Sequence, residues 1–343
     1  MKLSVRRRVL TLAQPLHTSY GTVSRRELLS ISLTDRAGAS GHGEAAPLPA
    51  YDGVGLERVQ RALARYRRAL AACGEPSDEQ VIEACHRADP LPAALAAVEM
   101  ALWDRAGRLQ GKPVAALLSE RPRGAVPVNA TLSALEPAAA AEQAAAAAAA
   151  GFSCVKVKVG VGDDGGRLAA VRAGAGADVA LRVDANGAWE VEQAVHAIDA
   201  LAPIGLELVE EPVHGVAAIR EVRARVAVRI AIDETAAHEG ALDAGAAHAV
   251  CLKISRCGGI SGLIAAAGVV RSSGADPYLA STLDGPVGTA AALHAAAALA
   301  ARGPLPHCGL ATLGLFAGIE DQLPPREGEI ALPAAPGLGV EPL

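Results

Sequence analysis

Aromatic residues are scarce in this sequence: two Trp, four Tyr and two Phe make up 2% of its 343 residues. Hydrophobic residues nevertheless reach 51%, so a core must be built mainly from Ala, Val, Leu and Ile. A chain of this length exceeds what one small core requires. It suits one large domain beside a smaller one.

Closely spaced cysteine pairs are also missing. The six cysteines are scattered without CxxC spacing, and several lie in apolar runs; they are Cys73, Cys85, Cys154, Cys251, Cys257 and Cys308. This pattern argues against a zinc site or a disulfide framework and indicates reduced, buried thiols in a cytoplasmic protein. The first residues, MKLSVRRRVL, contain no apolar segment typical of a signal peptide.

The sequence lacks a long basic tract and a long apolar run. Its formal net charge is −5, and no basic stretch contains interleaved aromatic residues, so no nucleic-acid partner is expected. The longest apolar stretch, residues 287–301, is alanine-rich and contains His294. It is too short for a membrane span, so we expect a buried helix there and no membrane partner.

Lysine is rare as well. Only five of the 32 basic residues are lysines, and the remaining 27 are arginines. Three of the five, Lys156, Lys158 and Lys253, lie inside apolar runs that resemble strands. A lysine amine can lose and regain a proton, whereas the arginine guanidinium does not deprotonate in proteins. Lysine at these three positions therefore suggests acid–base chemistry.

The pattern of apolar residues divides the chain into two regions. Residues 1–120 read as short strands, with a hairpin in 28–47, and helices over 56–72 and 91–119, which indicates an α+β domain. Residues 121–320 then alternate strands with alanine-rich helices; the expected strands are 126–132, 154–159, 180–186, 206–211, 228–234, 249–255, 276–282 and 306–311. Residues 321–343 are expected to return to the first domain.

Eight apolar strands at this spacing predict an α/β fold with a closed, TIM-like (β/α)8 barrel. The alternative is an open, doubly wound sheet. That fold would require a glycine-rich phosphate loop after its first strand, and none is present.

Charged residues interrupt five consecutive strands at their carboxyl ends. They are Lys156, Lys158, Asp184, Glu210, Glu211, Asp233, Glu234 and Lys253. Successive groups are 20 to 26 residues apart, which is about one strand–helix unit. In a barrel these ends meet at one rim, where active sites lie.

Lys156 and Lys158 are two residues apart and therefore point to the same side of their strand, toward the barrel interior. Burial, and a second ammonium group nearby, would lower the pKa of such a lysine and make it a general base at neutral pH. The alternative is that the amines only reach solvent at the barrel end. Lys253, on the opposite side, faces Lys158 unless it is a surface residue.

Three carboxylates, Asp184, Glu210 and Asp233, come from adjacent strands. They would repel one another unless a cation holds them, and hard oxygen ligands favour Mg²⁺ over zinc. The alternative is that each pairs with a separate arginine. Glu211 and Glu234 directly follow two of these residues and would point away from the ion, as supporting groups.

The motifs KVKVG, RVDANGAW, LVEEP, IAIDET and LKISRCGGI resemble, in order and spacing, the muconate-lactonizing subgroup of the enolase superfamily, also called the mandelate racemase/muconate lactonizing enzyme group. GEAAPLP and AAVEMALWDRAGRLQGKPV resemble its capping domain. The resemblance covers nearly the whole chain. It implies a fold of a barrel with an N-terminal α+β capping domain over residues 1–120.

The resemblance also implies a chemistry. Asp184, Glu210 and Asp233 match the Mg²⁺ ligands, with Mn²⁺ able to substitute, and Asn186 is a candidate supporting residue. Lys158 and Lys253 match paired acid/base lysines, and Lys156 matches the lysine that tunes Lys158. The shared step removes a proton α to a carboxylate and gives an enediolate.

The reaction that follows is less determined. Dipeptide epimerases of the subgroup carry a D-x-D after the eighth strand, where this chain has HCGL. The segments PVNATLSA, STLDGPVGTAAAL and HCGLATLGLF resemble actinobacterial-type o-succinylbenzoate synthases, lyases of menaquinone biosynthesis. In that reading Lys158 is the base, Lys253 a stabilising cation and Asp284 the acidic residue after strand seven. An N-acylamino-acid racemase, a muconate-type cycloisomerase and a dipeptide epimerase remain alternatives.

Substrate choice is expected to depend on capping-domain loops near residues 15–27 and 47–55. Substrate-contact candidates are His17, Tyr20, Tyr51, Ser281, Thr282 and Asp284. The expected partner is a small-molecule carboxylate, and a homo-oligomer is compatible with the sequence.

Overall fold

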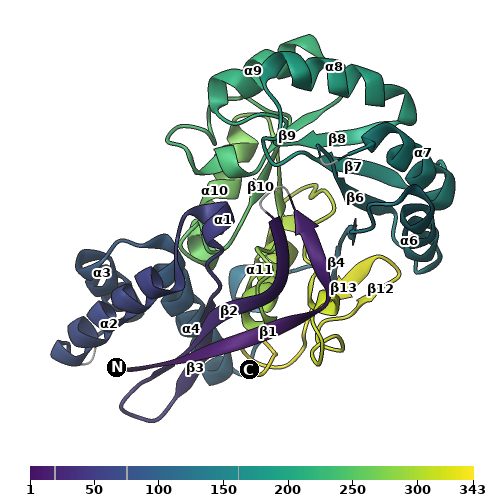
Figure 1. Cartoon of the computed structure of the whole chain (residues 1–343). Helices are drawn as coiled ribbons and strands as arrows, with labels where there is room; N and C mark the ends of the chain where they lie inside the picture. The colour runs from purple at the N-terminus through teal and green to yellow at the C-terminus, as the bar shows by residue number, and fades with distance from the viewer. Residues whose placement is uncertain (19–20, 75, 161) are drawn as a thin grey trace.

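The structure is a computed structural model that describes residues 1–18, 21–74, 76–160 and 162–343. Its N-terminal part is an antiparallel sheet covered by helices, and its C-terminal part is a curved parallel sheet surrounded by helices (Figure 1). The predicted architecture of a barrel with an α+β cap is therefore present.

The cap sheet has three strands in the order β1-β2-β3: β1 (Lys2–Thr18), β2 (Gly21–Thr34) and β3 (Ser40–Ala45). The predicted hairpin in 28–47 joins β2 to β3 through a turn in which Gly38 has a φ of 91°. Helix α4 lies so close to β3 that a Cβ on Gly43 would stand 1.9 Å from the Ala97 carbonyl oxygen. Glycine is thus required for this close packing.

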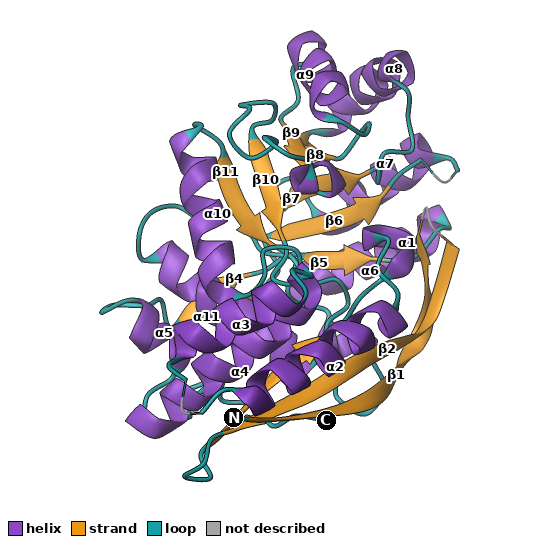
Figure 2. Ribbon diagram, turned by 90° about the vertical axis from the view of Figure 1, so that its left-hand side faces the viewer, coloured by secondary structure: helices purple, strands orange, loops and turns teal. Residues whose placement is uncertain are grey.

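The cap helices are α1 (Pro49–Asp52), α2 (Leu56–Ala72), α3 (Asp78–Ala88), α4 (Pro92–Gln110) and α5 (Val114–Leu118). The single helix expected over 91–119 is two helices. Gly111, at a φ of 64°, ends α4 in the left-handed conformation that glycine favours, and Pro113 precedes α5. Figure 2 shows α2 and α4 lying along the sheet.

The barrel sheet has seven parallel strands in the order β11-β10-β9-β8-β7-β6-β5. They are β5 (Ala130–Leu132), β6 (Cys154–Lys158), β7 (Ala180–Asp184), β8 (Leu206–Glu210), β9 (Ile230–Ile232), β10 (Ala249–Leu252) and β11 (Asp276–Leu279). The helices outside it are α6 (Pro137–Ala149), α7 (Asp164–Ala175), α8 (Val191–Leu201), α9 (Val216–Arg225), α10 (Ile260–Ser272) and α11 (Pro286–Ala300).

The eighth predicted strand, 306–311, is reduced to two isolated bridges. Cys308 pairs with Val128 and Gly309 pairs with Ala280, and both bridges are parallel. This segment therefore joins the two edges of the seven-stranded sheet.

The first predicted barrel strand, 126–132, is two strands in the structure. β4 (Ala125–Pro127) pairs antiparallel with β13 (Glu329–Ala331), which also pairs with β12 (Pro325–Arg326). Only β5 joins the barrel. Farther along, the Leu338 amide donates to Asp104 of α4, so the C-terminal segment contacts the cap.

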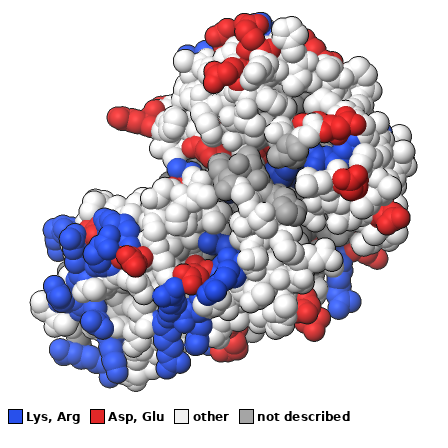
Figure 3. Space-filling view, in the orientation of Figure 1, with Lys and Arg blue, Asp and Glu red and all other residues white. Residues whose placement is uncertain are grey.

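Short 3-10 helices complete the fold: η1 (Ala202–Ile204), η2 (Glu234–Ala237) and η3 (Leu313–Leu315). Among the described residues, no helix combines the length and apolar character needed to cross a membrane. On the face shown in Figure 3, Lys and Arg side chains gather over the cap. Arg61, Arg65 and Arg68 of α2 are exposed, in contrast to the three lysines at the ends of barrel strands.

Candidate active site

A cavity of about 270 Å³ lies between the cap and the carboxyl ends of the barrel strands. Nine of the predicted site residues line it: Tyr51, Lys156, Lys158, Asp184, Asn186, Asp233, Lys253, Ser281 and Thr282. Leu16, Leu48 and Leu283 form an apolar part of the cavity wall. The ends of β6, β7, β9 and β10 therefore deliver charged groups to one cavity, under loops of the cap.

The two lysines of β6 face the barrel interior. Lys156 Nζ lies 2.6 Å from Glu210 Oε1 and 2.8 Å from Asp184 Oδ2. Lys158 Nζ lies 2.6 Å from the same Asp184 oxygen and 2.6 Å from Asn186 Oδ1. The Lys158 side chain keeps 22% exposure, so its amine is reachable from the cavity.

Lys253 follows β10, four strands away from β6. It forms an ion pair with Asp233, and its amine lies 3.9 Å from the centre of the Tyr51 ring. The Tyr51 hydroxyl donates to the other Asp233 oxygen at 2.6 Å. Tyr51 of the cap thus covers the amine of Lys253, whereas the side chain of Lys158 stays partly exposed in the cavity.

The expectation that burial lowers the pKa of the β6 lysines is wrong for Lys156. For Lys156, burial does oppose the charged form, but the carboxylates of Asp184 and Glu210 together raise its pKa. For Lys253, burial is likewise outweighed by Asp233, and the pKa lies well above its ordinary value. These carboxylates lie within hydrogen-bonding distance of the amines, and their charge outweighs the effect of burial.

The pKa values of the neighbouring carboxylates are shifted as well. Burial opposes ionisation of Asp184, yet the ammonium groups of Lys156 and Lys158 lower its pKa. Burial and then the charge of Asp184 raise the pKa of Glu210 to about 7. Three buried carboxylates from neighbouring strands are therefore balanced here by three ammonium groups.

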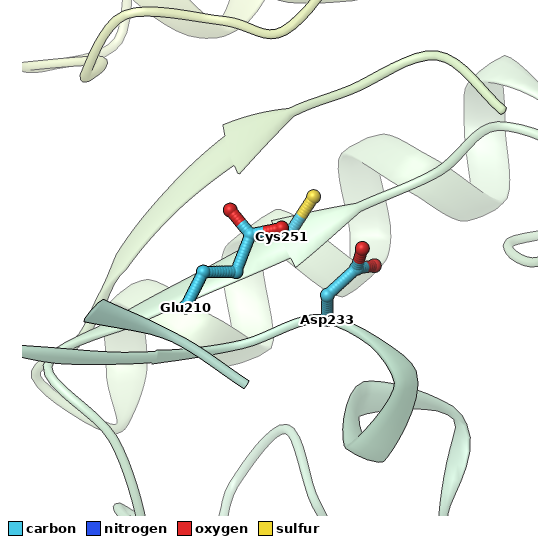
Figure 4. A group of neighbouring side chains, drawn as sticks. All are labelled: Glu210, Asp233 and Cys251. Atoms are coloured by element: carbon cyan, nitrogen blue, oxygen red, sulfur yellow. The ribbon is translucent and has the colours of Figure 1, made fainter. Parts of the chain in front are cut away.

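Two of the three predicted metal ligands, Glu210 and Asp233, lie close enough together to share a cation. Ligand atoms of Glu210, Asp233 and Cys251 all lie within 4.8 Å of one another, and all three residues are buried (Figure 4). Asp184 is the third carboxylate of the predicted set and is hydrogen bonded to both β6 lysines. Buried, convergent carboxylate oxygens are what Mg²⁺ takes from proteins.

Sequence reasoning missed Cys251 and Tyr278. Cys251 lies two residues before Lys253, so strand alternation alone places both on the interior side. Tyr278, on β11, donates its hydroxyl to Glu210 Oε2 at 2.6 Å. It thereby holds the carboxylate oxygen that Lys156 does not contact, and the Arg182 guanidinium lies 5.4 Å from its ring centre.

Glu211 and Glu234, which directly follow two of the predicted metal ligands, accept hydrogen bonds from residues around the site. Glu211, at a φ of 42°, accepts hydrogen bonds from the amides of Asp233 and Thr235 and from the Thr235 hydroxyl. Glu234 accepts from the Asn186 side-chain amide at 2.9 Å. Glu211 thus holds the backbone at the end of β9, where Asp233 begins its turn.

Replacing Glu211 with alanine is expected to lower the free energy of unfolding by at least about 3 kcal/mol, because hydrogen bonds to a charged group contribute roughly 1.5–3 kcal/mol each. Urea denaturation of this variant and of Glu239→Ala, an exposed glutamate nearby, would measure it. Equal stability of the two variants would contradict the supporting role.

The remaining substrate-contact candidates are placed differently. Asp284 is buried outside the cavity lining, and its carboxylate accepts from the amide and hydroxyl of Thr282. The structure therefore gives it a contact within its own loop. Tyr20 lies outside the described residues. His17 pairs through its backbone in β1, but its side chain lies outside what the structure describes.

Comparison with known protein families agrees with this geometry. The family description "Enolase C-terminal domain-like" matches residues 139–343, and "Mandelate racemase / muconate lactonizing enzyme, N-terminal domain" matches residues 1–119. The chain belongs to the mandelate racemase/muconate lactonizing enzyme family. The predicted membership of the enolase superfamily is confirmed.

Relatives within the family have different activities. The L-Ala-D/L-Glu epimerase of Bacillus subtilis is 30% identical over 87% of this chain and 84% of its own length. The o-succinylbenzoate synthase of Thermobifida fusca is 40% identical over 57% of this chain and 62% of its own. The chain is thus an enzyme of this family whose specific reaction these relatives leave unresolved.

Solved structures of the family are also similar. The dipeptide epimerase of Enterococcus faecalis, solved with Mg and the dipeptide L-Leu-L-Tyr, superposes with a TM-score of 0.89 at 26% identity, covering 98% of both chains. The N-succinyl Arg/Lys racemase of Bacillus cereus gives a TM-score of 0.90 at 26% identity, covering 99% of this chain and 95% of that one.

Proposed function

We propose that this enzyme is a Mg²⁺-dependent carbon–oxygen lyase, o-succinylbenzoate synthase, that dehydrates 2-succinyl-6-hydroxy-2,4-cyclohexadiene-1-carboxylate. The observation that carries this proposal is the charge of the cavity wall. Among the described residues that line the cavity, the only carboxylates are Asp184 and Asp233, both engaged by lysines. A substrate ammonium would find no free carboxylate there, so a dicarboxylate without an ammonium group fits better than a dipeptide.

The wall beyond the lysines supports the same substrate class. The segment after the eighth strand position contributes Gly309 and Thr312 to the lining, and β5 contributes Thr131. These residues offer a hydroxyl-bearing, uncharged surface next to leucines. An alicyclic ring carrying an uncharged ketone can lie against it without leaving a buried charge unpaired.

Residues of this chain can perform both proton transfers of the dehydration. Lys158 Nζ, as the free amine, takes the proton from the carbon α to the ring carboxylate, and an enediolate forms. Expulsion of the β-hydroxyl then breaks the carbon–oxygen bond, and the ammonium of Lys158 returns its proton to that oxygen, which leaves as water. The lysine ends as it began, and the ring becomes aromatic.

Other residues hold the charge that develops. Lys253, held by Asp233 and covered by the Tyr51 ring, presents a fixed positive charge on the other side of the cavity. Asp184, Glu210 and Asp233 would hold Mg²⁺, which when bound neutralises negative charge on the substrate carboxylate. Lys156 and Tyr278 orient Glu210 from two sides.

The test is the loss of ultraviolet absorbance of the cyclohexadiene substrate in the presence of Mg²⁺. Rapid loss with formation of the aromatic product would support the lyase. If the enzyme leaves this substrate unchanged but exchanges the α-proton of N-acylamino acids in D₂O, the assignment to a synthase is wrong and the proton-transfer chemistry stands.

A racemase or epimerase is the second candidate, favoured by lysines on two sides of one cavity. Substituting Lys253 with arginine separates the two. Arginine keeps the positive charge but cannot exchange a proton, so the dehydration is expected to persist, while any racemisation falls by at least about 10²-fold. Equal loss of dehydration and racemisation would mean that Lys253 acts as more than a charge.

A further inference from the structure

Two charged residues of the cap are buried against the barrel loop that follows β11. Arg26, on β2, and Glu44, on β3, are each only 4% exposed. Neither belongs to the lining of the cavity. Burying a charged group is costly unless specific partners receive it, so their contacts should show what they do.

The Arg26 guanidinium joins two segments, one of the cap and one of the barrel, that lie next to residues lining the cavity. It donates to the carbonyl oxygens of Ala46 and Pro47 in the cap, at 2.8 and 2.9 Å. It also donates to the carbonyl oxygens of Thr282 and Leu283 in the barrel loop, at 3.2 and 3.3 Å. One side chain thus fastens the segment preceding Leu48 to the segment containing Leu283.

The barrel loop needs such support. Leu283 has a φ of 59°, a left-handed conformation that costs a non-glycine residue energy and persists only where its surroundings impose it. The loop's own contacts run from Thr282 to the Asp284 carboxylate and from the Asp284 amide to the Ser281 hydroxyl. From outside the loop, the Ser281 amide is bonded to the Gly309 carbonyl oxygen of the barrel, and Arg26 adds contacts from the cap at Thr282 and Leu283.

Glu44 holds the other end of the same loop. Its carboxyl group accepts from the amide of Gly285, at 2.7 Å, and from that of Gly288, at the start of α11. A Cβ on Gly285 would stand 2.5 Å from a Glu44 oxygen, and one on Gly288 would stand 2.8 Å from the other. The two glycines therefore admit the carboxyl group of the cap to the first turn of a barrel helix.

We propose that Arg26 and Glu44 are positioning residues through which the cap holds the loop 280–285 in the shape that the substrate cavity requires. Ser281, Thr282 and Leu283 line that cavity together with Leu48 and Tyr51 of the cap. Arg26 holds the cap segment and the barrel loop together through their backbone oxygens, and Glu44 anchors the end of the loop. The role of this pair does not depend on which reaction the enzyme catalyses.

The first test compares Arg26→Lys with Arg25→Lys, its neighbour on β2, whose side chain is 63% exposed. Lysine keeps the charge but cannot present several donors in a fixed plane. Amide hydrogen exchange in residues 280–288 of Arg26→Lys is expected to accelerate by at least about 10-fold, and Arg25→Lys should match the wild type. This measurement needs no substrate, so it stands apart from the proposed lyase activity.

The kinetic arm uses the cyclohexadiene substrate. For Arg26→Lys, KM is expected to rise about 10-fold while kcat stays within about 3-fold, because the loop shapes the wall and contributes no reacting group. A variant that loses thermal stability but keeps wild-type exchange in 280–288 and wild-type KM would show a purely structural arginine. That outcome would overturn the proposal.

Glu44 supplies a second test, which remains decisive if Arg26→Lys does not fold. Burial and then the charge of Asp284 raise the pKa of Glu44 to about 8, while Arg26 and the amides of Gly285 and Gly288 oppose the rise. The charge of Asp52 acts on Arg26 in turn. These are the charged groups that face the pair from the cap and from the barrel loop.

A group whose pKa is raised in the folded state stabilises the fold fully below its ordinary value, here 4.5. That contribution is lost as the pH rises through about 8. Glu44→Gln keeps the neutral shape at every pH. The Tm of the wild type relative to Glu44→Gln is expected to fall between about pH 4.5 and about pH 8 and to level off above it, with faster exchange in 280–288 only in the wild type. Parallel pH profiles of Tm and of exchange would overturn the proposed role of Glu44.

Discussion

Substituting Lys158 with alanine is expected to reduce α-proton removal by about 10³- to 10⁴-fold, at the upper end of what a positioned general base contributes. Lys158 has the most exposed side chain of the three lysines that line the cavity, and its amine contacts Asp184 and Asn186. No neighbouring amine replaces it, because Lys156 is turned toward Glu210 and Asp184. Substrate turnover, or deuterium incorporation at the α-carbon, measures the loss.

The control is Lys112→Ala, an exposed lysine at the end of α4, which should keep wild-type rates. Circular dichroism and the Tm of Lys158→Ala should show a folded protein. If Lys158→Ala retains proton exchange while Lys253→Ala loses it, the base lies on the other side of the cavity and the proposed order of proton transfers is wrong.

The catalytic rim could be predicted from the sequence because its signals are local and periodic. Each charged group stands at the end of an apolar strand, and parallel strands of a barrel end at one rim. That argument places Lys158, Asp184 and Asp233 together, and the structure brings all three to the cavity. It could not give the charge balance, which depends on which amine contacts which carboxylate. The expected fall in the pKa of Lys156 was wrong for this reason.

The cap contacts could not be predicted, because they join residues that are distant along the chain. Arg26 meets Leu283 across 257 positions, and Glu44 meets Gly285 across 241. Neither residue stands out in the sequence, since a buried arginine and an exposed one look alike there. The acidic residue that the sequence did single out in this loop, Asp284, is bound to Thr282 instead. Tertiary packing, and not the local sequence, determines which partners Arg26, Glu44 and Asp284 contact.

Removal of divalent cations is expected to abolish turnover, with a loss of at least about 10³-fold, because charge neutralisation by a bound metal is worth several kcal/mol in the transition state. Dialysis against a chelator followed by titration with Mg²⁺ should restore the rate. A second readout needs no substrate: Mg²⁺ at 100 times its Kd should stabilise the fold by about 2.7 kcal/mol, visible as a rise in Tm.

The matched variants for this prediction are Glu210→Gln and Glu207→Gln, two glutamates of the same strand, β8. Glu210 lies among the candidate ligands, whereas Glu207 pairs with Arg182 at 2.7 Å near the other end of the strand. Glu210→Gln should lose both the recovery of turnover and the rise in Tm with Mg²⁺, and Glu207→Gln should keep both. If chelation leaves the wild-type rate unchanged, the three ammonium groups alone balance the carboxylates during turnover, and the magnesium assignment fails.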